Sequence, residues 1–340
     1  MKTFSRRAFL ASALVLVLVA GLLAGCGGGK APAAAPAKAP VKITVAHSSS
    51  VSLGDVVEML AWESLKSKGY EVTPKFLAKP ELAVQALTNG DAQFAAISSP
   101  TGMAAVQAGA KMKMVLEHKR NEWSMASRAE LTDPKQLDGK RVAIHSEGSI
   151  TNALVKWTNQ KYNIKPTILV IPGSDVRAQA LLSGQIDASP LEIQDALGVQ
   201  AKAPGKFHIL IAYSQLFPGL NGTAFWASDD WLAKNPKVVE DLIAANLETR
   251  RKAKADPQWL IGEAKRLFPQ LDAKLVETVV KAYLQADIWD VNGNLTPQTA
   301  DFSLKFYSEA GSIKGGDLLK PELYYDFGPL DAALKRLGKQ

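Results

Sequence analysis

The sequence has a single cysteine and lacks the short motifs that mark common enzyme families. With Cys26 alone, it has no disulfide framework and no structural zinc site built on cysteines. It contains no Gly-x-Ser-x-Gly elbow, no Walker-type phosphate loop and no Gly-x-Gly-x-x-Gly dinucleotide loop. No zinc-finger, RNP-type or mixed aromatic and basic pattern of nucleic-acid-binding proteins occurs either. What is present, 47% hydrophobic and 21% charged residues over 340 positions, is typical of a globular protein large enough for two domains.

Acidic residues are also missing before Asp55, and the first 25 residues form a basic start followed by an apolar run. This pattern predicts a signal peptide over residues 1–25 that is removed on export. Residues 5–10, Ser-Arg-Arg-Ala-Phe-Leu, resemble a twin-arginine signal, so we expect export by that route or by the general secretory route. A transmembrane anchor is the alternative, although the run is at the lower limit of what spans a bilayer.

The lone cysteine follows this apolar run directly. Residues 23–26, Leu-Ala-Gly-Cys, resemble a bacterial lipobox, which predicts that Cys26 is acylated and becomes the first residue of the mature chain. Residues 26–40 are rich in Gly, Ala and Pro and are expected to form a flexible tether. The export segment and tether hold five of the 40 basic residues, so the formal charge of +7 falls to +2 without them. We therefore expect no nucleic-acid partner.

From residue 41 onward, short apolar runs alternate with stretches of helical period. Strands are predicted at residues 42–46, 71–77 and 94–97, with helices over residues 53–65 and 82–87 between them. This β-α-β-α-β order predicts a sheet with helices on its faces. Towards the C-terminus helices dominate, and they are predicted at residues 236–254, 257–268, 272–286 and 296–309.

The same order of elements occurs a second time. Residues 85–93 and 179–187 are similar at a constant offset of 94, and each run precedes a predicted strand. Two lobes of like topology are therefore expected. The chain would cross to the second lobe after residues 113–117, through an extended segment at 124–129, and return at 221–227. We predict a first lobe of residues 41–123 and 224–340 and a second lobe of residues 124–223, with a hinge and a cleft between them.

The predicted strand ends next to this cleft are rich in hydroxyl groups. In open α/β sheets, ligands bind beyond the carboxyl ends of the strands, where helix N-termini present free N–H groups. The candidate ligand-binding residues there are Ser48, Ser49, Ser50, Ser98, Ser99, Thr101, Ser146, Gly148, Ser149, Ile150, Thr151 and Glu192. Their hydroxyl and N–H groups favour an anion. The alternative is that each Ser or Thr only caps its helix.

The charged segment at the first crossing supplies three further candidates, Arg120, Asn121 and Trp123. Trp123 would stack on a ligand and Arg120 would pair with an anionic group, whereas the alternative is a solvated turn. Residues 290–294 resemble a calcium loop, but Ile288 and Thr299 stand where its first and last acidic ligands are needed.

The histidines do not form a recognisable metal motif. His47 and His145 occupy equivalent strand ends, but no His-x-x-x-His or Glu-x-x-His spacing accompanies them. We therefore expect no metal, no cofactor and no catalytic residue, with His118 and His208 at the surface.

Several of these segments together resemble the solute-binding lipoproteins of ABC importers, of the nitrate/sulfonate/taurine/bicarbonate type, which includes binders of thiamine-pyrimidine precursors. The lipobox, residues 85–95 and the Leu-Asp-Gly-Lys-Arg-Val-Ala run at 137–143 carry the resemblance, and residues 178–188 and 229–236 continue it. It implies an α/β fold of periplasmic-binding-protein type II, with two α/β lobes joined by two hinge crossings. The implied protein is a lipid-anchored extracytoplasmic monomer that delivers a small solute to a membrane permease driven by an ATPase.

The sequence leaves the identity of the solute open. Where the family often has an aromatic-acid-proline run, this chain has Leu-Glu-Ile at residues 191–193. Glu192 beside the ligand would oppose a small anion such as a sulfonate, nitrate or carboxylate, and would favour an amine or a polar heterocycle such as a thiamine-precursor pyrimidine. An extracytoplasmic ligand sensor is a further alternative. A pyrimidine-synthase-like enzyme is less favoured, because the cysteine-rich motif of those enzymes is missing.

Overall fold

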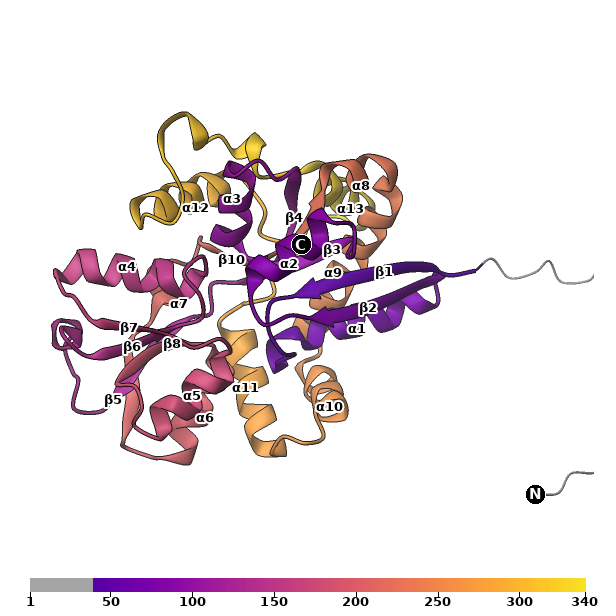
Figure 1. Ribbon diagram of the computed structural model, residues 1–340. Coiled ribbons are helices and arrows are strands. Elements are labelled where there is room, and N and C mark those ends of the chain that lie inside the picture. Colours follow the sequence, from indigo (N-terminus) through magenta and orange to yellow (C-terminus); the bar gives the residue numbers. More distant parts are fainter. Residues whose placement is uncertain (1–38) are drawn as a thin grey trace, which may run out of the picture. The chain divides into compact units, whose positions relative to one another are not determined.

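The computed structural model describes residues 39–340 (Figure 1). The expected signal peptide, the acylated Cys26 and residues 27–38 of the tether lie outside the described residues. Within them, the chain builds two five-stranded mixed sheets, each with helices packed on it. No helix among the described residues combines the length and apolar character that crossing a membrane requires.

The first sheet has the strand order β2-β1-β3-β10-β4. Its strands are β1 (Val41–His47), β2 (Tyr70–Phe76), β3 (Phe94–Ser98), β4 (Met112–Arg120) and β10 (Asn221–Ser228). β1 is parallel to β2 and β3, whereas β10 runs antiparallel to both β3 and β4. The helices between these strands are the 3-10 turn η1 (Leu53–Asp55), α1 (Val56–Lys66), α2 (Pro80–Thr88) and α3 (Ser99–Gln107).

The second sheet has the order β7-β6-β8-β5-β9. Its strands are β5 (Ser124–Arg128), β6 (Arg141–Ile144), β7 (Thr167–Val170), β8 (Ala188–Leu191) and β9 (Phe207–Ile211). The associated helices are η2 (Pro134–Leu137), α4 (Ile150–Tyr162), α5 (Ser174–Leu182), α6 (Ile193–Lys202) and α7 (Tyr213–Leu216). Each sheet thus has two parallel pairs and an antiparallel strand next to its edge, so the expected repeat of topology is confirmed.

The repeat extends to individual hydrogen bonds. α2 and α5 are each followed, after one intervening residue, by a glycine with positive φ, Gly90 (81°) and Gly184 (76°), and the offset between these glycines is the predicted 94 residues. After each turn, a polar side chain accepts a hydrogen bond from the neighbouring parallel strand of its sheet, β1 or β6. Gln93 Oε1 accepts from the N–H of Thr44, and Asp187 Oδ2 accepts from the N–H of Arg141. The similar runs at 85–93 and 179–187 therefore encode one helix-turn-strand unit used twice.

The chain passes between the sheets twice. β4 ends at Arg120 in the first sheet and β5 begins at Ser124 in the second. The return lies within residues 212–220, because Asn221 already pairs with Arg120 in the first sheet. Apolar side chains bury both passages, and one core cluster continues from Trp226 through Trp123 to Ile144.

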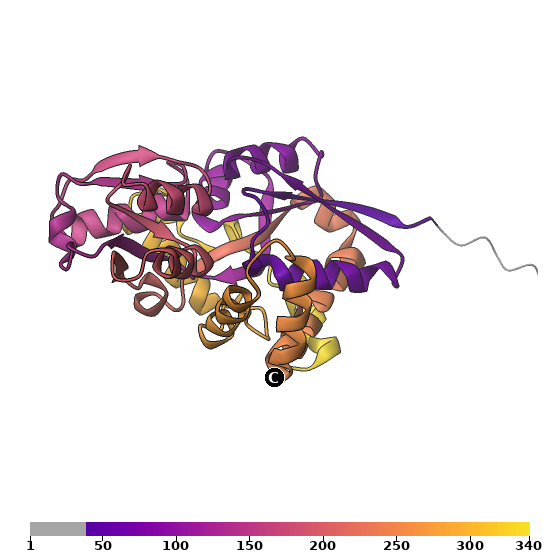
Figure 2. The same ribbon diagram turned by 90° about the horizontal axis from the view of Figure 1, so that it is seen from below.

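The C-terminal part after β10 is helical. It comprises α8 (Asp229–Lys234), α9 (Pro236–Ala255), α10 (Pro257–Leu267), α11 (Ala273–Gln285), α12 (Pro297–Glu309), η3 (Gly316–Leu318), η4 (Pro321–Leu323) and α13 (Gly328–Leu337). α9 packs on α1 and α13, and α11 contacts α6 of the second lobe (Figures 1 and 2). The predicted helices 236–254, 257–268, 272–286 and 296–309 are confirmed to within one residue at each end.

Candidate functional site

A cavity of about 260 Å³ lies between the two sheets, where strands of both lobes end. Nine of the residues proposed from the sequence as ligand-binding line it. From the first lobe and the first crossing these are Ser48, Ser49, Ser50, Ser98 and Trp123. From the second lobe they are Ser149, Ile150, Thr151 and Glu192. Ser149 and Glu192 immediately precede α4 and α6, so the N-termini of both helices open onto the cavity.

Three further candidates join the lobes beside the cavity instead of lining it. Thr101 Oγ1 in the first lobe donates to the carbonyl of Gly148 in the second, at 2.8 Å. Ser146 Oγ donates to Glu81 Oε1 across the same gap, at 2.9 Å. These hydrogen bonds hold the lobes together in the present arrangement.

Two candidates are buried away from the cavity. Ser99 is the first residue of α3 and is fully buried, because the helix turns its side chain inward. Asn121 Nδ2 donates to the carbonyl of Tyr213 at 2.9 Å. Since Asn121 lies in the first passage between the sheets and Tyr213 in the second, this bond ties the two passages together.

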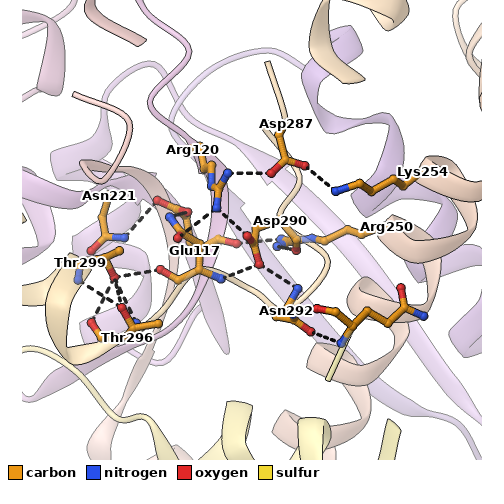
Figure 3. Close-up of polar contacts among 12 residues, drawn as sticks. Glu117, Arg120, Asn221, Arg250, Lys254, Asp287, Asp290, Asn292, Thr296 and Thr299 are labelled. Atoms are coloured by element: carbon orange, nitrogen blue, oxygen red, sulfur yellow. Dashed lines mark hydrogen bonds and ion pairs between the residues drawn. The ribbon is translucent and has the colours of Figure 1, made fainter. Parts of the chain in front are cut away.

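Arg120 does not line the cavity, which corrects its expected place beside a ligand. Its guanidinium pairs with Asp287 at 2.7 Å and with Asp290 (Figure 3), and it donates to Asn294 Oδ1 at 3.3 Å. Asp290 and Asn294 belong to the segment that resembles a calcium loop. This loop therefore holds an arginine side chain.

A bulge in β4 explains the positions of Arg120 and its neighbours. Glu117 pairs with Ala224 and Lys119 with Thr223, so His118 is an extra residue in the strand. Consequently His118 and Lys119 both line the cavity. The expectation that His118 lies at the surface is wrong, since it is only 3% exposed.

Lys119 is the buried cation of the cavity. Its Nζ lies 3.2 Å from Glu122 Oε1, 3.4 Å from Asp55 Oδ1 and 3.8 Å from Glu192 Oε1. Burial alone would lower the pKa of Lys119, but these three carboxylates hold it well above its ordinary value. The lysine is therefore charged and already paired by the protein.

Carboxylates outnumber cations around the cavity. Asp175 and Asp195 line it in addition to Asp55 and Glu192. Burial, together with the charge of Glu192, raises the pKa of Asp195 to about 6. Burial likewise raises the pKa of Glu122 to about 7, against the opposing effect of Lys119. Both shifts show that further negative charge is disfavoured here.

A second polar cluster lies at the end of the cavity near α1. Glu58 Oε2 is 3.0 Å from His118 Nε2, and Glu58 Oε1 is 3.5 Å from His47 Nε2. His118 Nε2 is also 3.7 Å from Asp55 Oδ1. Burial disfavours the charge of Glu58, but the two histidines lower its pKa to about 2.

His145 lines the cavity from the second lobe and has a different environment. Its Nδ1 accepts a hydrogen bond from the N–H of Gly173 at 3.2 Å. Burial and the nearby charge of Arg177 lower the pKa of His145 to about 4, so its ring is neutral at physiological pH. His208, expected at the surface, is half-buried and contacts the carbonyl of Leu131 through Nε2.

Arg177 supports the second-lobe wall and has no counterpart among the residues proposed from the sequence. It is completely buried, and its guanidinium lies 5.7 Å from the centre of the Trp123 ring. It donates to the carbonyls of Ile171 and Gly173 and so fixes the turn before α5.

The residues that sequence reasoning missed are mostly charged and buried, namely Asp55, Glu58, Lys119, Glu122, Arg177 and Asp195. One signal was available. The dense charge of residues 117–122, directly between two apolar strands, is unusual for a simple surface turn. Together these groups make a site that can bind a small polar solute through hydroxyl groups, N–H groups and carboxylates.

Comparison with known proteins gives one family match. A family model described as NMT1/THI5 like matches residues 65–259, more than half of the chain. No curated protein matches the sequence significantly.

Solved structures show the same fold at low sequence identity. A zinc-bound ligand-binding component of an ABC-type import system from Staphylococcus aureus has a TM-score of 0.70 and 12% identity, covering 87% of this chain and 99% of that one. The periplasmic nitrate-binding protein NrtA from Synechocystis has a TM-score of 0.68 and 15% identity, covering 88% and 90%. The alkanesulfonate-binding protein SsuA from Xanthomonas axonopodis pv. citri, bound to MOPS, has a TM-score of 0.66 and 16% identity, covering 85% and 99%. The predicted two-lobed periplasmic-binding-protein fold is thereby confirmed.

Proposed function

Because this chain belongs to the NMT1/THI5-like family, we propose that it is the solute-binding component of an ABC-type importer. The observation that carries the proposal is the cavity, which is enclosed by strand ends and helix N-termini of both lobes. Cross-lobe hydrogen bonds such as that from Thr101 to Gly148 lie directly beside it. A solute bound between the lobes would stabilise this arrangement, and the closed protein would dock on the permease. The role is binding and delivery, not catalysis.

The charges of the cavity favour a solute with N–H donors over an anion. Asp55, Glu192 and Asp195 line it, and its lysine is already paired with carboxylates. An anion entering here would lose its hydration without gaining a free cation. An amine or a polar nitrogen heterocycle would instead donate to the carboxylates and accept from the hydroxyls of Ser48 and Ser49, which also line the cavity.

We further propose that the protein works outside the cytoplasmic membrane, held there by acylated Cys26. The signal-peptide pattern of residues 1–25 and the lipobox at residues 23–26 support this location. The charged-residue balance outside the leader and tether gives no reason to expect a nucleic-acid partner. The importer role is favoured over a sensor role because two of the structural relatives reported above carry importer or periplasmic-binding names.

The proposal is tested by identifying what the protein binds. Native mass spectrometry of protein purified from its own host is expected to reveal a co-purifying small nitrogen compound, released unchanged on unfolding. In thermal-shift assays we expect an aminopyrimidine to raise the melting temperature, and nitrate and taurine to leave it unchanged. Conversion of the compound during incubation would overturn the binding role.

A matched pair of variants tests the proposed carboxylate contact. Glu192→Gln keeps the size of the side chain but removes its charge, so it should weaken binding of the aminopyrimidine by about 10-fold. Glu309→Gln removes an exposed carboxylate of α12, remote from the cavity, and should change nothing. Binding of nitrate or taurine that improves in Glu192→Gln, with no aminopyrimidine binding to the parent, would show that the solute is an anion.

A further inference from the structure

We propose that Asp55, Glu58 and His118 form a binding site for a divalent transition-metal ion, of the zinc class, at the end of the cavity near α1. Each offers one ligand atom, and these atoms lie within 4.8 Å of one another. All three side chains are buried; Glu58 is 1% exposed and His118 is 3% exposed. The inference goes beyond solute transport and does not depend on it.

The distances suit a small tetrahedral ion. Zinc binds oxygen and imidazole nitrogen at about 2.0–2.1 Å, which places neighbouring ligand atoms of a tetrahedron about 3.3 Å apart. In the cluster, His118 Nε2 is 3.0 Å from Glu58 Oε2 and 3.7 Å from Asp55 Oδ1. An ion between these atoms therefore needs only small side-chain movements.

Several buried polar atoms of the cluster face only one another. Both carboxylate oxygens of Glu58 and the Nε2 atoms of His47 and His118 lie in close pairs, but they make no well-directed hydrogen bond among the described residues. Buried polar atoms are normally satisfied by such bonds, so lone pairs gathered at one point suit an ion bound between them. His47 Nε2 faces Glu58 Oε1 at 3.5 Å, so His47 is placed to orient the carboxylate.

Buried charges of both signs surround the cluster. Lys119 lies beside Asp55 and Glu122, whereas the imidazoles of His47 and His118 face Glu58. The neighbouring Arg250 directs its guanidinium to the backbone carbonyls of Glu117 and His118. An ion at Glu58 would therefore be bound by imidazole nitrogen and carboxylate oxygen, which are ligand types of zinc.

The fold brings the three ligands together from separate elements. Asp55 ends η1, Glu58 lies in the first turn of α1, and His118 is the extra residue of the β4 bulge. Asp55 and His118 also line the cavity. A metal held by three protein side chains would thus keep one coordination position open to the cavity, where water or a donor atom of the solute could bind.

The test measures metal binding without any solute. The protein is dialysed against a chelator and titrated with Zn²⁺ by calorimetry, and Co²⁺ is added separately to detect coordination by its visible absorption. We expect one ion per chain and a Co²⁺ spectrum typical of nitrogen and oxygen ligands. Glu58→Gln and His118→Gln should each weaken Zn²⁺ binding by about 100-fold or more.

The control is His208→Gln, which removes a histidine that contacts the carbonyl of Leu131 and does not line the cavity, and which should bind Zn²⁺ as the parent does. Circular dichroism verifies that each variant is folded, and the Co²⁺ spectrum is measured on the parent alone. The proposal is overturned if the parent binds neither ion, if His118→Gln binds Zn²⁺ as tightly as the parent, or if His208→Gln loses binding equally. Solute binding by the chelator-treated protein tests the proposed transport role separately.

Discussion

At the scale of single residues, His145 links the cavity to the stability of the fold. Its pKa is about 4 in the folded protein, because burial and Arg177 disfavour the charged ring, whereas the ordinary value is 6.5. Between these two values the unfolded chain binds a proton that the folded protein does not. The stability from His145 is therefore complete above about pH 6.5 and is lost as the pH falls towards 4.

His145→Gln should remove this part of the acid sensitivity. We expect the parent to lose up to about 3 kcal/mol of unfolding free energy relative to the variant between pH 7 and pH 4. Urea unfolding of both proteins at several pH values measures the difference. If the two curves of stability against pH stay parallel, the pKa of His145 is the same in the folded and unfolded chains, and its lowering by burial and Arg177 is disproved.

Gly102 tests how closely α3 packs on β10. A Cβ atom at this position would lie 2.3 Å from Cε2 of Trp226, which is fully buried in the core. We expect Gly102→Ala to lower the unfolding free energy by about 1–3 kcal/mol through overpacking. Gly262→Ala, in α10, is the matched control, because a Cβ there meets open space and the helix should gain up to about 1 kcal/mol. Equal effects of the two changes in urea unfolding would contradict this packing.

The sequence predicts some of the cavity residues and misses others for a physical reason. Ser98 and Ser149 were found because hydroxyl groups at strand ends in an α/β fold face a common edge. Glu58 and His118 were missed because their meeting depends on a bulge and on the packing of α1, neither of which leaves a periodic signal. Buried charged residues also contradict the usual pattern in which charge marks the surface.

At the scale of elements, the β4 bulge and the loop at residues 287–294 form a unit. The bulge turns Arg120 away from the cavity, and the loop receives its guanidinium through Asp287 and Asp290 (Figure 3). This network attaches the segment after α11 to the central sheet. Arg120 thus belongs to the framework behind the site.

Arg120→Ala should accordingly affect stability and not solute affinity. Because it leaves Asp290 without its cation, and Asp287 with only Lys254 at 3.4 Å, we expect a loss of about 1–3 kcal/mol in urea unfolding. Lys234→Ala breaks an exposed pair with Asp230 and should cost less than about 0.5 kcal/mol. Weakened solute binding in Arg120→Ala, with unchanged stability, would instead show that Arg120 contributes to the binding site.

Secondary structure was more predictable than the site at this scale. The helices after residue 236 were placed closely, since proline at their first turns and long apolar periods mark them. The repeat at offset 94 was visible because each copy needs a glycine after its helix, Gly90 and Gly184. The end of β4 could not be predicted in the same way. The strand extends to Arg120, whereas the charges of segment 118–123 indicate a loop.

At the scale of the whole described region, a few hydrogen bonds join the two lobes around the cavity. They include Thr101 Oγ1 to Gly148, Ser146 Oγ to Glu81, and the N–H of Leu53 to Gln194 Oε1. Each of these hydrogen bonds joins residues more than 40 positions apart in the sequence, so no local sequence pattern predicts them. If the lobes open about the two passages, as we propose, these contacts form on closure and contribute to solute affinity.

Thr101→Val tests that contribution, since valine keeps the shape of threonine and removes only the hydroxyl group, which reaches Gly148 in the second lobe and Ser98 in its own lobe. The lost hydrogen bond is worth about 1 kcal/mol, so affinity for the solute should fall about 5-fold. The solute-free variant should also show a larger radius of gyration by X-ray scattering, because its closed form is less populated. Thr88→Val is the control, because that hydroxyl bonds only to carbonyls of its own helix. Identical affinity and scattering in Thr101→Val and the parent would mean that this contact does not distinguish a closed form from an open one.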